Sequence, residues 1–105
     1  MGYFVWLSFD PQMGREQAGR RPALVVSPKD YNKTVGLALV CPLTTQVKGY
    51  PFEVAVPAGT PIKGVILADH IKSVDWEARK AVRICEAPRG MTLRVLAMLE
   101  SLIEN

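Results

Sequence analysis

The chain has 105 residues, of which 49% are hydrophobic and 22% charged, and it carries a formal net charge of +3 with a pI of about 9.1. A chain of this length and composition is expected to form a single domain over residues 1–105, with enough core to fold without disulfides or a structural metal, which excludes a disulfide scaffold and a disordered protein. No stretch approaches the roughly 20 apolar residues of a membrane-spanning helix, and the modest positive charge favours an anionic partner.

The first third of the chain predicts two strands separated by a polar loop. Residues 3–9, YFVWLSF, are rich in aromatic and β-branched side chains and predict a strand. Residues 10–20 contain two glycines, two arginines and a glutamate, and this loop is longer than the usual two to five residues of a hairpin. Residues 22–27, PALVVS, predict a strand buried on both faces, and residues 27–34, SPKDYNKT, have the composition of a turn.

The middle of the chain continues the pattern of short strands. Residues 35–47 form a long strand-like run with a bend at Pro42, and residues 52–57 alternate as a half-buried strand. Residues 65–74 and 81–87 predict two more strands.

Only the C-terminal segment has a helical pattern. In residues 91–103, MTLRVLAMLESLI, a single stripe contains Leu96, Leu99, Leu102 and Ile103, and Thr92 is a candidate N-cap. Five or six short strands followed by one helix predict a mainly β fold, in which a small, strongly bent antiparallel sheet or open barrel is closed by the helix.

The cysteines and the N-terminus bear on the cellular compartment. Cys41 and Cys85 lie far apart inside apolar runs, so we expect two free thiols in a reducing compartment rather than a disulfide or a metal site. The opening MGYFVWLSF lacks the basic start and cleavage site of a signal peptide. We therefore expect a cytoplasmic location and no membrane partner.

Polar side chains at strand positions are candidates for function. Arg21 precedes Pro22, so its backbone should be extended, and a guanidinium fixed at the edge of the core suits phosphate binding better than a flexible lysine. The alternative is a solvated surface pair with Arg20. Thr44 and Thr45 lie in CPLTTQ, although strand hydroxyls are most often satisfied by the backbone.

Other chemical candidates have weaker support from the residues alone. Glu16 is either a loop charge or a general base, and His70, beside Asp69, is either an acid–base group or, more often for a lone histidine, a structural residue. The sequence contains no cysteine–histidine cluster with zinc spacing, no glycine-rich phosphate loop and no Ser-His-Asp set.

Taken together, these segments resemble a known family over the whole chain. WLSFDPQMGREQAGRRPALVVSP is similar to the opening motif of the MazF/PemK toxin family, G-x-E-Q-x-G-x-R-P followed by a strand. The segments YN, CPLTTQVKGYPFEV and GVILADHIKSVDW resemble the rest of the family pattern in order and spacing. The resemblance implies the small SH3-like barrel of the MazF/Kid/CcdB type, with antiparallel strands and a C-terminal helix, acting as a homodimer.

The same resemblance implies an activity and its partners. It indicates the toxin of a type II toxin–antitoxin system, a sequence-specific and ribosome-independent endoribonuclease (an mRNA interferase) that uses no metal or other cofactor. Single-stranded RNA would be cleaved by attack of its own 2′-hydroxyl, leaving a 2′,3′-cyclic phosphate and a 5′-hydroxyl. The expected protein partner is a cognate MazE-like antitoxin, whose acidic segment would compete for the RNA groove and with which the toxin would bind DNA.

Site residues follow from the family motif position by position. Arg21 and Thr44 match the catalytic arginine and threonine, and Glu16 matches the glutamate of the motif. Arg15 and Arg20 would contact phosphates. Arginine stays protonated at neutral pH and is a poor base, so Arg21 is assigned charge stabilisation and Glu16 is the better candidate base, although the sequence leaves that choice open. The other matched positions, which line the site or the RNA groove, are Gln17, Ser27, Thr45 and Gln46.

Two departures from the family and two rival functions complete the interpretation. His70 stands where relatives often have glutamine. Arg15 stands where Kid-type members carry a catalytic histidine, so the catalytic assignment of the Kid-type members does not transfer to this chain.

A gyrase-poisoning toxin of the CcdB type needs a C-terminal tryptophan, and none follows Trp76. A non-catalytic RNA- or protein-binding barrel would not need the three matched catalytic positions together.

Overall fold

The computed structural model describes residues 2–9 and 19–104, so most of the predicted loop 10–20 lies outside the described residues. The elements in chain order are β1 (Tyr3–Ser8), β2 (Arg20–Val25), α1 (Lys29–Val35), β3 (Leu37–Thr44), β4 (Glu53–Ala55), β5 (Val65–Leu67), the 3-10 turn η1 (Ala68–His70), β6 (Lys72–Asp75), β7 (Val82–Glu86) and α2 (Arg89–Ile103).

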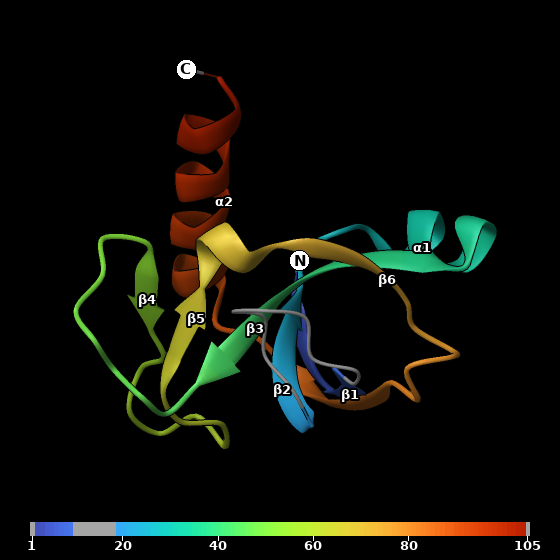
Figure 1. Ribbon diagram of the computed structural model, residues 1–105, viewed down its shortest axis with the longest axis horizontal. Helices are drawn as coiled ribbons and strands as arrows, with labels where there is room; N and C mark the ends of the chain where they lie inside the picture. The colour runs from blue at the N-terminus through green and yellow to red at the C-terminus, as the bar shows by residue number, and fades with distance from the viewer. Residues whose placement is uncertain (1, 10–18, 105) are drawn as a thin grey trace.

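All strand pairs of the described residues are antiparallel. They form one seven-stranded sheet in which six strands follow the order β4-β5-β3-β2-β1-β7 and the seventh, β6, pairs with β3 off this path. The central strand is β3, which pairs with β2 along one edge and with both β5 and β6 along the other. Figure 1 shows the strong bend that this arrangement produces, with α1 and α2 at opposite ends of the sheet. The predicted mainly β fold with a C-terminal helix is confirmed, while among the described residues the barrel stays open between β4 and β7.

The segment predicted as one strand over residues 65–74 is two strands separated by η1. Leu43 pairs with Ile66, whereas Val40 pairs with Lys72, so three residues are looped out between β5 and β6. The Cys41 thiol donates to the carbonyl oxygen of Ala68 at 3.8 Å, inside this turn. The apolar pattern of VILADHIKSV does not reveal such an insertion, because both halves are strand-like.

Residues 27–34 were predicted as a turn, and this prediction is wrong for most of the segment, which forms α1. Pro28 occupies the N-cap, Asp30 lies in the first turn and Lys33 in the last, so both charges complement the helix dipole. Gly36 ends the helix with φ +81°, a left-handed conformation that favours glycine.

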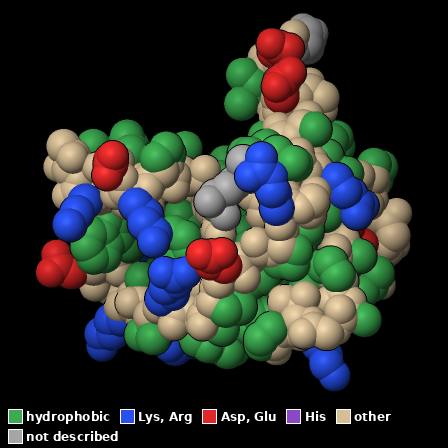
Figure 2. All heavy atoms as spheres, turned by 180° about the vertical axis from the view of Figure 1, so that it is seen from behind, with side chains coloured by type: hydrophobic (Ala, Val, Ile, Leu, Met, Phe, Trp, Pro, Cys, Tyr) green, Lys and Arg blue, Asp and Glu red, His purple; other side chains and the backbone are tan. Residues whose placement is uncertain are grey.

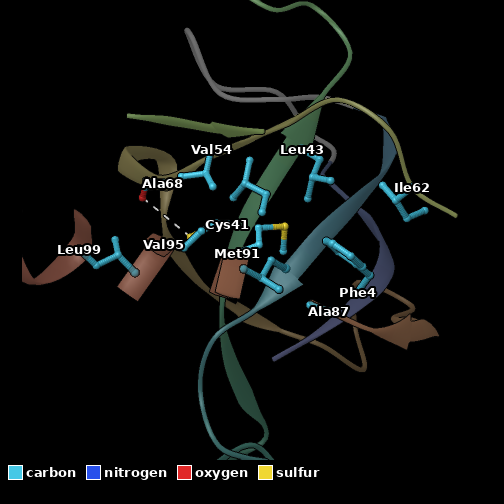
Figure 3. Close-up of a cluster of buried hydrophobic side chains, with 12 residues drawn as sticks. Phe4, Cys41, Leu43, Val54, Ile62, Ala68, Ala87, Met91, Val95 and Leu99 are labelled. Carbon is cyan, nitrogen blue, oxygen red and sulfur yellow. Dashed lines mark hydrogen bonds between the residues drawn. The ribbon is translucent and has the colours of Figure 1, made fainter. Parts of the chain in front are cut away.

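Alternating side chains supply a hydrophobic core on each face of the sheet. On the face under α2, the core includes Phe4, Cys41 and Leu43, and Figure 3 shows Met91 and Val95 of α2 pointing into this cluster. The second core, on the other face, contains Val5, Leu7, Phe9, Ala23, Val25, Ala38, Val40 and Val74. Both cysteines are free thiols, as predicted, Cys41 buried and Cys85 half-buried.

The C-terminal helix buries only part of the predicted stripe: Leu99 is buried and Leu96 packs against the core, whereas Leu102 and Ile103 are exposed. It begins at Arg89 after Pro88, so the prediction of Thr92 as N-cap is wrong: Thr92 is buried within the helix, and its hydroxyl donates to the Pro88 carbonyl at 3.0 Å. The last turn of α2 stands clear of the sheet (Figure 1), where Leu102 is 44% and Ile103 80% exposed. The buried stripe is Met91, Thr92, Val95 and Leu99. None of the described helices has the length and apolar character needed to cross a membrane.

Candidate functional site

The antiparallel register of β2 and β3 brings two predicted site residues together. Ala23 lies opposite Pro42 in the last pair of the β2–β3 ladder. Arg21 precedes Ala23 by two residues and Thr44 follows Pro42 by two, so both lie beyond that pair at the same end of the sheet, and side chains two residues apart on a strand share a face. Both side chains are half-buried. A guanidinium and a hydroxyl are therefore placed on one face at the same end of the sheet.

The neighbouring strand β5 fixes the position of Thr44. It is the last residue of β3 and pairs with Val65 of β5. Gly64, just before β5, has φ +118°, and a Cβ atom there would lie 3.0 Å from the Thr44 carbonyl carbon and overlap its oxygen. Only glycine allows this close approach, so Gly64 sets the backbone position of Thr44.

The Thr44 hydroxyl keeps its proton available for a substrate. Its oxygen accepts a hydrogen bond from the backbone N–H of Gln46 at 3.1 Å. A hydroxyl has one donor and two acceptor positions, and among the described residues the Thr44 hydroxyl donates to no acceptor. The Gln46 contact thus orients the oxygen and leaves the donor for a phosphoryl oxygen.

A cavity of about 290 Å³ opens beside Thr44. One wall is formed by the chain after β3, with Gln46, Lys48 and Tyr50. The opposite wall is formed by Glu53 of β4, Leu67 of β5 and His70 of η1. The predicted site residues Thr44 and Gln46 therefore line one hollow, and the lone histidine, which sequence reasoning favoured as structural, lines it too. Thr45, which lies between them in the chain, is exposed.

The structure does not bring Arg20 to this group. Consecutive strand residues point to opposite faces, so Arg20 faces away from Arg21. Its guanidinium donates to the Lys80 carbonyl at 2.9 Å and to Ser8 Oγ at 3.4 Å. Those contacts hold it against β1 and the segment before β7. Predicted site residues Arg15, Glu16 and Gln17 lie outside the described residues.

Ser27 lies at the far end of β2 from Arg21, six residues or about 20 Å along an extended chain. It is buried, and its hydroxyl accepts from the backbone N–H of Leu39 at 2.9 Å. The Asn32 amide nitrogen donates to the same hydroxyl and to the Pro28 carbonyl. This network attaches α1 to the sheet, so Ser27 is not grouped with Arg21 and Thr44.

A thiol in the core has a strongly raised pKa. Burial, and to a lesser extent the charge of Asp69, raises the pKa of the Cys41 thiol from 9.0 to about 12. Cys41 is therefore a protonated core residue at neutral pH. Within residues 2–9 and 19–104, no group of three or more histidine, cysteine or carboxylate side chains is arranged to hold a metal ion.

A larger cavity of about 450 Å³ lies next to α1 and contains none of the predicted site residues. Its floor includes Val5, Val25 and Trp76, and its rim carries Lys29 and Lys33. Figure 2 shows apolar surface with both basic and acidic side chains around it on this side of the molecule. Its position by α1, away from the end of β3, separates it from the Arg21–Thr44 pair.

Sequence reasoning missed two residues that build the site. Gly64 was not singled out, and Glu53 was treated as an ordinary residue of the strand predicted over residues 52–57. The pattern GVIL carries no signal for the close approach to Thr44, because that contact joins residues 20 positions apart. The alternation in FEVAVP likewise does not show that the Glu53 carboxylate accepts hydrogen bonds from the preceding loop.

Comparisons with known proteins bear on the family and the fold. Residues 1–103 match the family model described as PemK-like, MazF-like toxin of type II toxin–antitoxin system. The chain is 53% identical over 83 residues to the endoribonuclease toxin MazF of Escherichia coli K12, covering 79% of this chain and 74% of that one. Its structure is similar to crystal structures from Deinococcus radiodurans: MazF, with TM-score 0.93, 50% identity and coverage of 98% and 94%, and a MazE–MazF complex, with TM-score 0.85, 46% identity and coverage of 97% and 91%.

Proposed function

Because this chain belongs to the PemK-like, MazF-like toxin family of type II toxin–antitoxin systems, we propose that it is a sequence-specific endoribonuclease with Arg21 and Thr44 in its catalytic centre. The observation that carries the proposal is the β2–β3 register, whose last pair, Ala23 and Pro42, is followed at the same end of the sheet by Arg21 on β2 and Thr44 on β3. The substrate is single-stranded RNA, because sequence-specific reading of RNA needs unstacked bases.

The reaction uses a nucleophile that RNA itself contains. The 2′-hydroxyl attacks the adjacent phosphorus, a new P–O2′ bond forms, and the P–O5′ bond breaks. The proton of the 2′-hydroxyl passes to a base, and the departing 5′ oxygen takes a proton from an acid. The products are a 2′,3′-cyclic phosphate and a 5′-hydroxyl, and the step needs no metal or other cofactor.

Each described site residue has a distinct part in this step. Thr44 donates its hydroxyl proton in a hydrogen bond to a phosphoryl oxygen, with the Gln46 N–H holding the Thr44 oxygen in place. Arg21 stabilises the negative charge that develops on the phosphoryl oxygens, for which a fixed fork of donors is well suited. Glu16, on the loop outside the described residues, is the proposed general base.

Regulation and assembly follow the family. A MazE-like antitoxin binds and inhibits the toxin, in keeping with the similarity to a MazE–MazF complex, and the exposed apolar end of α2 favours a homodimer. We place the protein in the cytoplasm, where mRNA is available to it.

Two substitutions test the catalytic assignment. Arg21→Ala and Thr44→Ala should each abolish cleavage of a long single-stranded RNA, while circular dichroism and the oligomeric state stay as in the wild type. Arg79→Ala, which removes another guanidinium near β1, is the matched control and should remain active. Full activity of either site variant would remove that residue from the catalytic centre.

A further inference from the structure

We propose that the cavity beside Thr44 is a subsite for one nucleobase of the RNA, and that Tyr50 supplies the surface on which this base stacks. The inference rests on the proposed endoribonuclease function. At about 290 Å³, the cavity is at the lower limit of roughly 300 Å³ for small-molecule sites, so it suits one base. Because Thr44 forms part of its wall, the bound base belongs to a nucleotide next to the phosphate that Thr44 contacts.

The cavity offers an aromatic face and an apolar floor. Tyr50 is 60% exposed although it is a large aromatic residue, and the Lys48 ammonium lies 6.0 Å from its ring centroid. Leu67, on the opposite wall, is only 7% exposed. Aromatic rings accompanied by basic side chains are the usual stacking platforms for single-stranded nucleic acid. A flat base inserted against Tyr50 would cover both the ring and the leucine.

The polar groups of the cavity favour a base over a phosphate. The Gln46 amide and the His70 imidazole each offer donor and acceptor capacity, and within the described part of the chain neither side chain makes a hydrogen bond. They are therefore able to pair with the edge of a base. The carboxylate of Glu53 also lines the cavity and offsets the positive charge of Lys48, so the pair gives the cavity no net positive charge to attract a phosphate group.

The loop that carries Tyr50 is fixed before any RNA binds. The Glu53 carboxylate accepts hydrogen bonds from the backbone N–H groups of Lys48 at 3.1 Å and Gly49 at 3.0 Å. The Glu53 N–H donates to the Tyr50 carbonyl at 3.1 Å, and the loop is tied to η1 because the N–H of Ala68 donates to the Phe52 carbonyl at 3.1 Å. A preformed subsite of this kind binds with less loss of conformational entropy.

The test pairs an abasic substitution in the RNA with a substitution in the protein. A short RNA cut at one bond is prepared with an abasic nucleotide at each position around that bond, and KM and kcat are measured for the wild type and for Tyr50→Ala. One position is expected at which the abasic change raises KM for the wild type by about 10- to 100-fold, the range of a lost base–aromatic stack. Tyr50→Ala should raise KM for the intact RNA similarly, with little further change on the abasic RNA.

Two control variants separate stacking from other effects. Tyr50→Phe keeps the ring and should retain the wild-type KM, whereas Tyr31→Ala removes a 40% exposed tyrosine on α1 and should retain full sensitivity to the abasic position. His70→Ala should broaden the base preference at that same position when cleavage ends are mapped.

The possible outcomes distinguish this inference from the proposed function. If the intact RNA is cleaved but Tyr50→Ala and the abasic change act independently at every position, the subsite is refuted while the endoribonuclease function stands. If the wild type cleaves no RNA, the proposed function fails and the subsite fails with it.

Discussion

Substitution of Gly64 by alanine should damage catalysis without touching any group that reacts. The new Cβ atom would lie 3.0 Å from the Thr44 carbonyl carbon and 3.3 Å from the Cα atom of Thr45, while carbon atoms normally approach to about 3.5–4.0 Å. The backbone at the end of β3 must therefore move by a sizeable fraction of an ångström or more, since the carbonyl oxygen overlaps the new atom as well.

The substitution should have two effects, a loss of stability from backbone strain and a loss of activity from displacement of Thr44, and a control variant separates them. A non-glycine residue at φ +118° costs about 1–3 kcal/mol of backbone strain, or about 4–8 °C in Tm for each kcal/mol in a domain of this size. Gly59→Ala is the matched control, because Gly59 has φ +91° and no heavy atom within 4 Å of the position where its Cβ would lie. Both variants carry the strain, and only Gly64→Ala displaces Thr44.

Urea unfolding and RNA cleavage measured on both variants give the answer. Gly64→Ala should be the less stable of the two and should lose about 100-fold in kcat, the typical effect of a misplacement of about 1 Å in a catalytic group. Gly59→Ala should lose stability alone and keep the wild-type kcat. Equal kcat values for the two variants, both close to wild type, would refute the idea that Gly64 positions Thr44.

Three further predictions concern the thiols and the partners. Burial raises the pKa of Cys41 to about 12, so the half-buried Cys85 should react first with a thiol reagent at pH 8. The raised pKa belongs to the folded state, so protonated Cys41 favours folding fully below pH 9. This contribution to the free energy of unfolding should be lost as pH rises from 9 toward 12, which urea unfolding would detect. The exposed Leu102 and Ile103 should be covered in a homodimer, and sedimentation at micromolar concentration that gave only an 11.6 kDa species would contradict this. An acidic antitoxin segment should bind less tightly as salt increases, given the net charge of +3, and an affinity unaffected by salt would count against a charge-led interface.

The strands and the final helix were predictable from local pattern, because each buries a face through its own apolar periodicity. The start of β1 at Tyr3 follows directly from a run of aromatic and β-branched residues, while β2, predicted over residues 22–27, spans Arg20–Val25. The local sequence pattern did not predict the features that depend on tertiary contacts. The short α1 depends on the buried Asn32 for its attachment, and Leu102 fits the apolar stripe of α2 but lies beyond the sheet that would have buried it.

The candidate site was likewise predictable only in part. Arg21 and Thr44 were identified by resemblance to a family, and the residues alone left a structural role open for Thr44. The fold adds what neither approach contained, which is the β2–β3 register that brings them to the same end of the sheet. The contributions of Gly64 and Glu53 depend on backbone atoms of distant or turn residues, and such contacts leave no trace in side-chain periodicity.

The central claim is that the RNA supplies its own nucleophile at the Arg21–Thr44 centre, and one substituted oligonucleotide tests it most directly. The nucleotide on the 5′ side of the cut is replaced by its 2′-deoxy form, with EDTA present throughout so that no added metal takes part. We predict that cleavage at that bond stops, that the substituted RNA still binds and inhibits competitively, and that the unsubstituted RNA gives a 2′,3′-cyclic phosphate at an unchanged rate. Cleavage of the deoxy-substituted bond would show that water is the nucleophile, and loss of activity on the unsubstituted RNA in EDTA would show that a metal is required; either result would contradict the account.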